Sequence, residues 1–327
     1  MKNKIIKISA IIGILMLVYI IYIIGPEHIL KNIKNISLIN FTILCALRIL
    51  YWLLRTINWK TIINKYGENL SLSHLFFARM SGHSVSQLTP SSQMGSEATR
   101  ILMTNASTRK VSIASIILDK TIELFSVVSL TAIGVIVAFN HISLPQKLKL
   151  FFILAIITFI SFILFIFFKQ KRGILSWIVN LLDKFKFKIK FIEKNREKLR
   201  ETDEFVLEFY KKHKSTFLKV FFLYILLIFL WITEIHLTLK FIGIENISFI
   251  DSFIITTLGN IALIFPFIPG SIGVYEATYV GLCALVGISA DIAITMVFIR
   301  RIIALALAGF GLLAMWRLGN LKKRSGN

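Results

Sequence analysis

The sequence predicts an all-α fold: a polytopic membrane helical bundle of about six full spans plus two broken, re-entrant hairpins, or about eight hydrophobic segments. Two observations lead to this prediction. The 327 residues are 56% hydrophobic and their mean hydropathy is +0.76, whereas a soluble domain is about 45–50% apolar. Apolar runs of about 17 to 25 residues also recur along the chain, and a helix of that length crosses a ~30 Å hydrocarbon core. We therefore expect one integral membrane domain, residues 1–327.

Six apolar runs have the length of full spans. We place these spans at residues 5–24, 36–57, 111–139, 150–168, 216–239 and 292–316. The first run is too long for a signal peptide and lacks a small-residue cleavage site, so we expect it to remain as an anchor. Two further stretches, 70–110 and 249–288, each contain two short arms around a break of Pro, Gly or Ser. We interpret these stretches as the hairpins.

The net charge of +21 is concentrated beside the predicted spans. Residues 169–214, which we expect to form a cytoplasmic loop, carry 14 Lys/Arg against 7 Asp/Glu, and both termini are basic. Basic residues next to apolar runs mark the cytoplasmic side, and they attract anionic headgroups. We therefore expect a multi-pass protein of the cell (plasma) membrane with cytoplasmic N- and C-termini and no nucleic-acid partner. Cys45 and Cys283 lie in apolar runs, which indicates neither a disulfide framework nor a metal site.

The two hairpin breaks align without a gap. Residues 89–98 read TPSSQMGSEA and residues 268–277 read IPGSIGVYEA. The matched pairs are Pro90 with Pro269, Ser92 with Ser271, Glu97 with Glu276 and Ala98 with Ala277, and the central glycines are Gly95 and Gly273. Three expected spans separate the copies, so the two units would have opposite topology. We predict an inverted repeat of residues 1–139 and 148–317, an arrangement that places substrate sites near the midplane at discontinuous helices.

The residues of each break have distinct effects on the backbone. Proline removes a helix donor, glycine permits conformations and close approaches that other residues resist, and the serine can cap the following helix. The glutamate then lies near the positive N-terminal end of that helix. Broken backbone at membrane depth is tolerated only where protein buries it or a watery cavity meets it. The alternative interpretation is a pair of capped turns at the membrane surface.

These motifs resemble those of a known family. PGSIGVYEA resembles the P-G-x-x-G-x-x-E-A signature of the lysylphosphatidylglycerol synthase transmembrane family of flippase-like membrane proteins. PSSQMGSEATR resembles that family's first motif, although Ser91 and Ser92 replace its usual glycines. In the bacterial multiple-peptide-resistance proteins such a region precedes a soluble aminoacyl-transferase domain and is implicated in moving lysyl-lipid between leaflets. The resemblance implies handling of a lipid or a lipid-linked substrate. Because the chain stops at Asn327, we expect no lysyl transfer.

Charged residues inside the apolar runs are further candidates. Arg300 and Arg301 fall well inside the last span, where a charge is costly unless it pairs. Glu276 and Glu97 are the expected partners, and a static structural ion pair is the alternative. A structural role is the favoured interpretation for Arg48, Asp119, Glu123 and Glu234, which also lie in the expected spans. The third span could instead begin at Leu124, which would leave Asp119 and Glu123 at the interface.

We predict a polar groove that binds a phosphate-bearing headgroup while the acyl or prenyl chains stay in lipid. The predicted substrate-binding residues are Pro90, Ser92, Gly95, Glu97, Arg100, Pro269, Gly270, Ser271, Gly273, Glu276, Arg300 and Arg301. We expect no catalytic residue, metal or cofactor, and the sequence contains no nucleotide-binding loop. The expected partners are membrane lipids (an anionic phospholipid or a polyprenyl-phosphate-linked substrate) and a separate synthase or transferase.

The predicted function is translocation of lipid or lipid-linked glycan. Two alternatives remain open at this stage. The protein could be an accessory membrane subunit that binds a lipid- or glycan-modifying synthase through residues 169–214. It could instead be a polyprenyl-linked sugar transferase, for which Glu97, His83 and Glu276 are the available acid–base residues.

Overall fold

The computed structural model describes residues 36–88, 92–104, 106–185, 195–260 and 274–324, together with Glu27 and Glu193. Its regular structure over these residues is helical and contains no strand, which confirms the all-α fold class. Within the described residues, five helices are long and apolar enough to cross a membrane. They are α3 (Leu38–Ile63), α6 (Arg109–His141), α7 (Gln146–Gln170), α11 (Lys214–Ile242) and α14 (Ala290–Arg324). They match five of the six expected spans, and the span expected at 5–24 lies outside the described residues.

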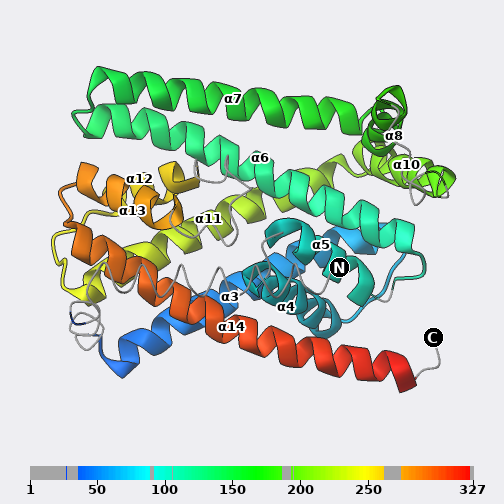
Figure 1. Cartoon of the computed structure of the whole chain (residues 1–327), viewed down its shortest axis with the longest axis horizontal. Helices are drawn as coiled ribbons and strands as arrows, with labels where there is room; N and C mark the ends of the chain where they lie inside the picture. Colours follow the sequence, from blue (N-terminus) through cyan, green and yellow to red (C-terminus); the bar gives the residue numbers. More distant parts are fainter. Residues whose placement is uncertain are drawn as a thin grey trace.

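Shorter helices lie at the two ends of this bundle (Figure 1). They are α4 (Leu72–Leu88), α5 (Ser92–Met103), α8 (Ile174–Lys184), α10 (Arg196–Lys212), α12 (Phe249–Gly259) and α13 (Val274–Leu285), with the 3₁₀ turn η1 (Asn64–Tyr66) after α3. Figure 1 shows α4, α5, α8 and α10 toward the end of the bundle at which α14 finishes, which we call the basic end. The helices α12 and α13 lie at the opposite end. The helix pair α4 and α5 and the helix pair α12 and α13 therefore lie toward opposite ends of the bundle.

The outer faces of the long helices are apolar. On α7 the side chains of Leu154 and Phe168 are 55% and 58% exposed, and further large apolar residues of this helix are exposed between them. A soluble protein rarely exposes so large a contiguous apolar surface. Because the same face is favourable against hydrocarbon, this exposure is the arrangement expected of a helix that contacts lipid.

One helix of each pair, α4 and α12, packs against the last long helix of the other half of the chain. Gly311 of α14 lies directly against α4, where a Cβ atom would overlap the carbonyl oxygen of Met80. Gly134 of α6 lies against α12, where a Cβ atom would overlap the side chain of Thr257. Only glycine permits such close backbone approach. The inverted repeat of residues 1–139 and 148–317 stays a prediction.

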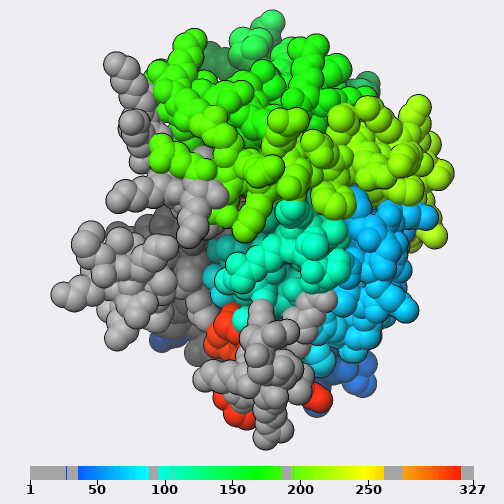
Figure 2. Space-filling model, turned by 90° about the vertical axis from the view of Figure 1, so that its right-hand side faces the viewer, coloured from blue at the N-terminus to red at the C-terminus, as the bar shows by residue number. Residues whose placement is uncertain are grey.

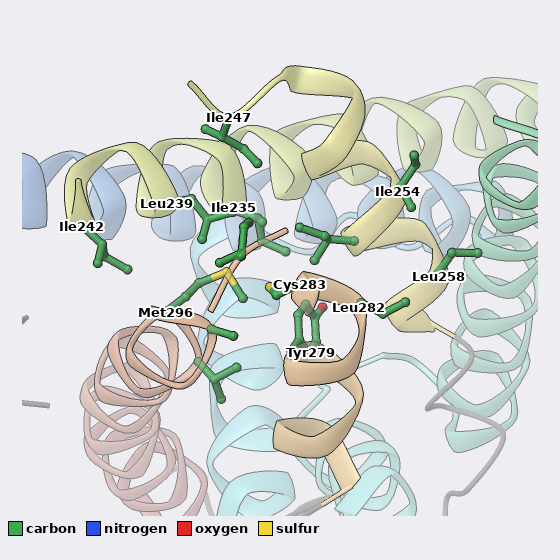
Figure 3. Packing of buried hydrophobic residues seen from close by; sticks show 14 of the residues in the cluster. Ile235, Leu239, Ile242, Ile247, Ile254, Leu258, Tyr279, Leu282, Cys283 and Met296 are labelled. Atoms are coloured by element: carbon green, nitrogen blue, oxygen red, sulfur yellow. The ribbon is translucent and has the colours of Figure 1, made fainter. Parts of the chain in front are cut away.

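The apolar core is divided along the length of the bundle. At the end opposite the basic end, α11 to α14 pack around residues such as Leu239, Cys283 and Met296 (Figure 3). A second cluster joins α3, α6, α10 and α11 and includes Leu118 and Phe209. Arg48 of α3 and Glu234 of α11, both buried, lie along their helices between these two apolar regions.

The basic segment 169–214, expected as a loop, is largely helical. Asp203 of α10 accepts hydrogen bonds from the backbone nitrogens of Leu175 (3.0 Å) and Ser176 (2.8 Å) at the start of α8. An anion at a helix N-terminus satisfies free N–H groups and the helix dipole. Gly173, with φ of +85°, makes the turn before α8. Figure 2 looks at this end and shows α10 beside the last turns of α3 and the start of α6.

Candidate functional site

One face of α3 carries alternating arginine and tryptophan residues. Arg48, Trp52, Arg55 and Trp59 are spaced by four, three and four residues, so they lie on one side of the helix. Arg48 is ten residues from the start of α3 at Leu38, which is about 15 Å at the α-helical rise. That distance is roughly half of a ~30 Å hydrocarbon core. The stripe therefore runs from about 15 Å along α3 toward the basic end.

The residues Arg48, Trp231, Glu234 and Arg300 form a buried group that we call the Trp231 cluster. They come from α3, α11 and α14. Arg48, Glu234 and Arg300 are buried, and Trp231 is half-buried. Glu234 forms an ion pair with Arg48, and its Oε1 lies 3.4 Å from Nη1 of Arg300. The two guanidinium groups lie 5.2 and 5.0 Å from the Trp231 ring centroid, within the range of a cation–π interaction.

Arg300 is the least satisfied member of the Trp231 cluster. Its side chain is 3% exposed, and Nε, Nη1 and Nη2 have no hydrogen-bond partner of ordinary geometry among the described residues. Glu234 and the hydroxyl of Tyr275 are its near neighbours. Two arginines share one carboxylate, so the cluster carries one positive charge in excess. Donors of this kind can bind an anion.

A second group, the Trp59 cluster, consists of Trp59, Arg79, Arg100, Asp119 and Tyr224. Asp119 is fully buried and accepts hydrogen bonds from Arg79 Nη2 (2.9 Å), Arg100 Nη2 (2.7 Å) and the Tyr224 hydroxyl (2.5 Å). Both guanidinium groups face the Trp59 ring, at 5.4 and 4.1 Å from its centroid. Two arginines again share one carboxylate.

A third ion pair lies on α3 and α6 between these clusters. Arg55 pairs with Glu123 and lies 5.2 Å from the Trp52 ring centroid. Tyr51 makes an edge contact with the ring of Trp231, at a centroid distance of 5.2 Å. Charged and aromatic side chains thus connect the two clusters through the interior of the bundle.

The structure pairs one of the predicted glutamates with one of the predicted arginines. Arg301 of α14 forms an ion pair and a hydrogen bond with Glu276 of α13, as the sequence led us to expect. Glu97 was the other expected partner, and that expectation is wrong within the described residues. Glu97 makes no ion pair there and is partly buried, while Arg300 faces Glu234 instead.

The other predicted site residues fall into two groups. Arg100 belongs to the Trp59 cluster, and Gly95 lies in α5, where its carbonyl accepts a hydrogen bond from Thr99 Oγ1 (2.8 Å). Ser92 begins α5, and its side chain is outside the described part. The remaining predicted residues lie outside the described residues, namely Pro90, Pro269, Gly270, Ser271 and Gly273. Whether the two breaks meet near the midplane stays a prediction.

Two charged residues lie deeper inside the bundle than the sequence suggested, namely Arg55 and Asp119. Arg55 was expected near the boundary of the second span, but α3 continues to Ile63 and the Arg55 side chain is only 14% exposed. Asp119 was weighed as a residue at the interface, but α6 starts ten residues earlier and buries it. The 3–4 spacing of the α3 stripe was the local signal that could have identified Arg48 and Arg55 as interior residues.

Comparison with known proteins matches residues 6–311 to the family described as Lysylphosphatidylglycerol synthase TM region. The chain belongs to this family. The matched range contains every residue of the two clusters. The chain is also similar to a protein named "UPF0104 membrane protein" from Methanothermobacter thermautotrophicus, with 24% identity over 314 residues that cover 91% of this chain and 90% of that protein. Family membership and the five apolar helices make this a multi-pass membrane protein.

Proposed function

We propose that the protein moves a lipid or lipid-linked substrate with a phosphate-bearing headgroup between the leaflets, and that the Trp231 cluster binds the phosphate. The family connects the chain with lipid metabolism or transport. The observation that carries the finer proposal is the excess cation of the Trp231 cluster: Nε and Nη2 of Arg300 have no hydrogen-bond partner among the described residues, and Nη1 has only the ion-pair contact with Glu234. We propose no covalent chemistry, so the protein would not be an enzyme.

The physical basis is the cost of an excess charge in the membrane interior. An uncompensated buried cation costs several kcal/mol, and a protein keeps it when the charge is compensated during function. A phosphate oxygen is a suitable acceptor because guanidinium groups bind phosphate with two parallel hydrogen bonds. Arg48 and Arg300 approach Glu234 from different helices. A phosphate would take up the nitrogens that Glu234 leaves free.

The location of the cluster suits a substrate with long apolar chains. Arg48 and Arg300 are each ten residues from the start of their helices, or about 15 Å along the helix axis. A headgroup at this depth is midway between the leaflets, and its acyl or prenyl chains can remain in the surrounding lipid. We propose that the basic end faces the cytoplasm of the cell. It carries α8, α10 and the last residues of α14, which are rich in Lys and Arg, and such residues are enriched on the cytoplasmic side.

The proposal is tested with the full-length chain reconstituted into liposomes. Phosphatidylglycerol with a fluorescent NBD group on its acyl chain is placed in both leaflets, and external dithionite bleaches the label that reaches the outer leaflet. We expect bleaching to continue beyond the outer leaflet only when the protein is present. NBD-labelled diacylglycerol-linked sugar, which has no phosphate, measures how far the effect depends on the headgroup.

Arg300→Gln is the decisive variant. It removes the excess cation and leaves Arg48 and Glu234 as a balanced pair, so we expect it to fold. Its rate should fall about tenfold or more, since a hydrogen bond to a charged group contributes about 1.5–3 kcal/mol and 1.4 kcal/mol corresponds to a factor of ten. Arg317→Gln is the matched control, because Arg317 is an exposed residue of the same helix. Equal rates for Arg300→Gln and the unchanged protein, or no movement by the unchanged protein, would refute the proposal.

A further inference from the structure

The Trp59 cluster repeats the composition of the Trp231 cluster at another depth. Each contains two arginines, one carboxylate and a tryptophan ring against which both guanidinium groups lie. Along α3, eleven residues separate Arg48 from Trp59, or about 16 Å at the helical rise. The Trp59 cluster is therefore nearer to the basic end.

The positive charge of the Trp59 cluster is not cancelled by its neighbours. The charges beside it are two cations, Arg55 and Lys120, and two carboxylates, Glu97 and Glu123. Glu123 lies within ion-pair distance of both cations. These four charges balance one another, so one positive charge in excess remains with the two arginines that share Asp119.

The hydrogen bonds of the cluster leave one N–H donor of each guanidinium group without a partner among the described residues. Arg79 and Arg100 both use Nη2 to donate to Asp119, and Nε of each is buried without a hydrogen-bond partner among the described residues. Arg79 is 2% and Arg100 5% exposed. Buried N–H groups of an arginine are normally satisfied. Both guanidinium groups donate to the same oxygen, Oδ2 of Asp119, so each arginine keeps one unpartnered N–H donor beside this carboxylate.

We propose that the Trp59 cluster is a second binding site for a lipid phosphate, nearer to the basic end than the Trp231 cluster. The inference rests on the proposed function, because it takes the same substrate class through a second position. The ligand is a phosphate ester at the head of a lipid, bound by the unpartnered Nε donors of Arg79 and Arg100 while Asp119 keeps its hydrogen bonds to Nη2 of both. A headgroup would then pass between two sites of equal charge, along the arginine and aromatic side chains of α3.

The test counts binding sites and does not require transport. The full chain, purified in a neutral detergent, is titrated with dioctanoyl phosphatidic acid by isothermal calorimetry, and dioctanoylglycerol gives the background without phosphate. We expect two saturable sites per chain for the unchanged protein and for Arg317→Gln. Arg100→Gln and Arg300→Gln should each retain one site, and the double variant should retain none. Inorganic phosphate alone should fill neither site.

Arg100→Gln leaves Arg79 and Asp119 as a balanced pair, and Arg79→Gln makes the same change of charge at a different residue. The proposal is overturned if either variant elutes as a folded protein and still binds two molecules. A single site in the unchanged protein, lost in Arg300→Gln alone, also overturns it while leaving the proposed function intact. Absence of any saturable site removes both. A second site filled by inorganic phosphate alone overturns the assignment to a lipid.

Discussion

Asp119→Asn tests the Trp59 cluster as a structural unit. The carboxylate is fully buried and holds two guanidinium groups and a tyrosine hydroxyl. Asparagine keeps the shape and removes the charge, which leaves Arg79 and Arg100 without a counter-ion. Removing one partner of a buried ion pair costs about 3–5 kcal/mol. We therefore expect the free energy of unfolding to fall by about 3–5 kcal/mol.

The measurement is equilibrium unfolding of the purified chain in detergent micelles, followed by circular dichroism. Asp183→Asn is the matched control, because Asp183 pairs with Arg196 at the surface, where ion pairs contribute about 0–1 kcal/mol. Adding Arg100→Gln to Asp119→Asn removes one of the two stranded cations, so the double variant should regain part of the loss. The reasoning is refuted if Asp119→Asn is as stable as Asp183→Asn, or if the double variant is no more stable than Asp119→Asn alone.

Three further predictions concern other parts of the bundle. Glu276→Gln leaves the Arg301 cation without its partner and should lower expression of the protein. Combining it with Arg301→Gln should restore expression. If the double variant is expressed normally but still does not move lipid, the pair also acts on the substrate. Gly134→Ala places a methyl group inside the contact with α12 and should destabilise the fold by about 1–3 kcal/mol, and unfolding measurements that show no change would contradict the close packing. In a variant without the native cysteines, a cysteine introduced at Lys198 should react with an impermeant maleimide only from the cytoplasmic side. A cysteine introduced at Asn246 should react only from outside. The reverse labelling pattern would show that the proposed orientation is wrong.

The helical architecture follows from the sequence because span length is a local property. The apolar runs near residues 36–57 and 111–139 predict α3 and α6, since an apolar run of sufficient length has few alternatives in a membrane. The predicted ends of these spans were less accurate than their positions, because α3 continues to Ile63 and α6 begins at Arg109. Polar residues near the span ends were taken as boundaries, although the bundle buries them in pairs.

The partners of the buried charges could not be deduced in the same way. Arg48 and Glu234 are 186 positions apart in the chain, and nothing local to either residue identifies the other. Glu276 and Arg301 were paired correctly because both lie in the last hairpin and the span that follows it. The expected pairing of Glu97 with an arginine of the last span failed because Glu234, on a different helix, lies closer to Arg300.

The close contact of α14 with α4 at Gly311 also has a mechanical consequence. Because main chain meets main chain there, these two helices cannot slide apart without losing dense packing, and they should move as one rigid body. Arg79 belongs to α4 and Arg300 to α14, so a single displacement of this body relative to α3 shifts one arginine in each cluster at the same time. We therefore expect a change in the spacing of the arginines in one cluster to be accompanied by a change in the other.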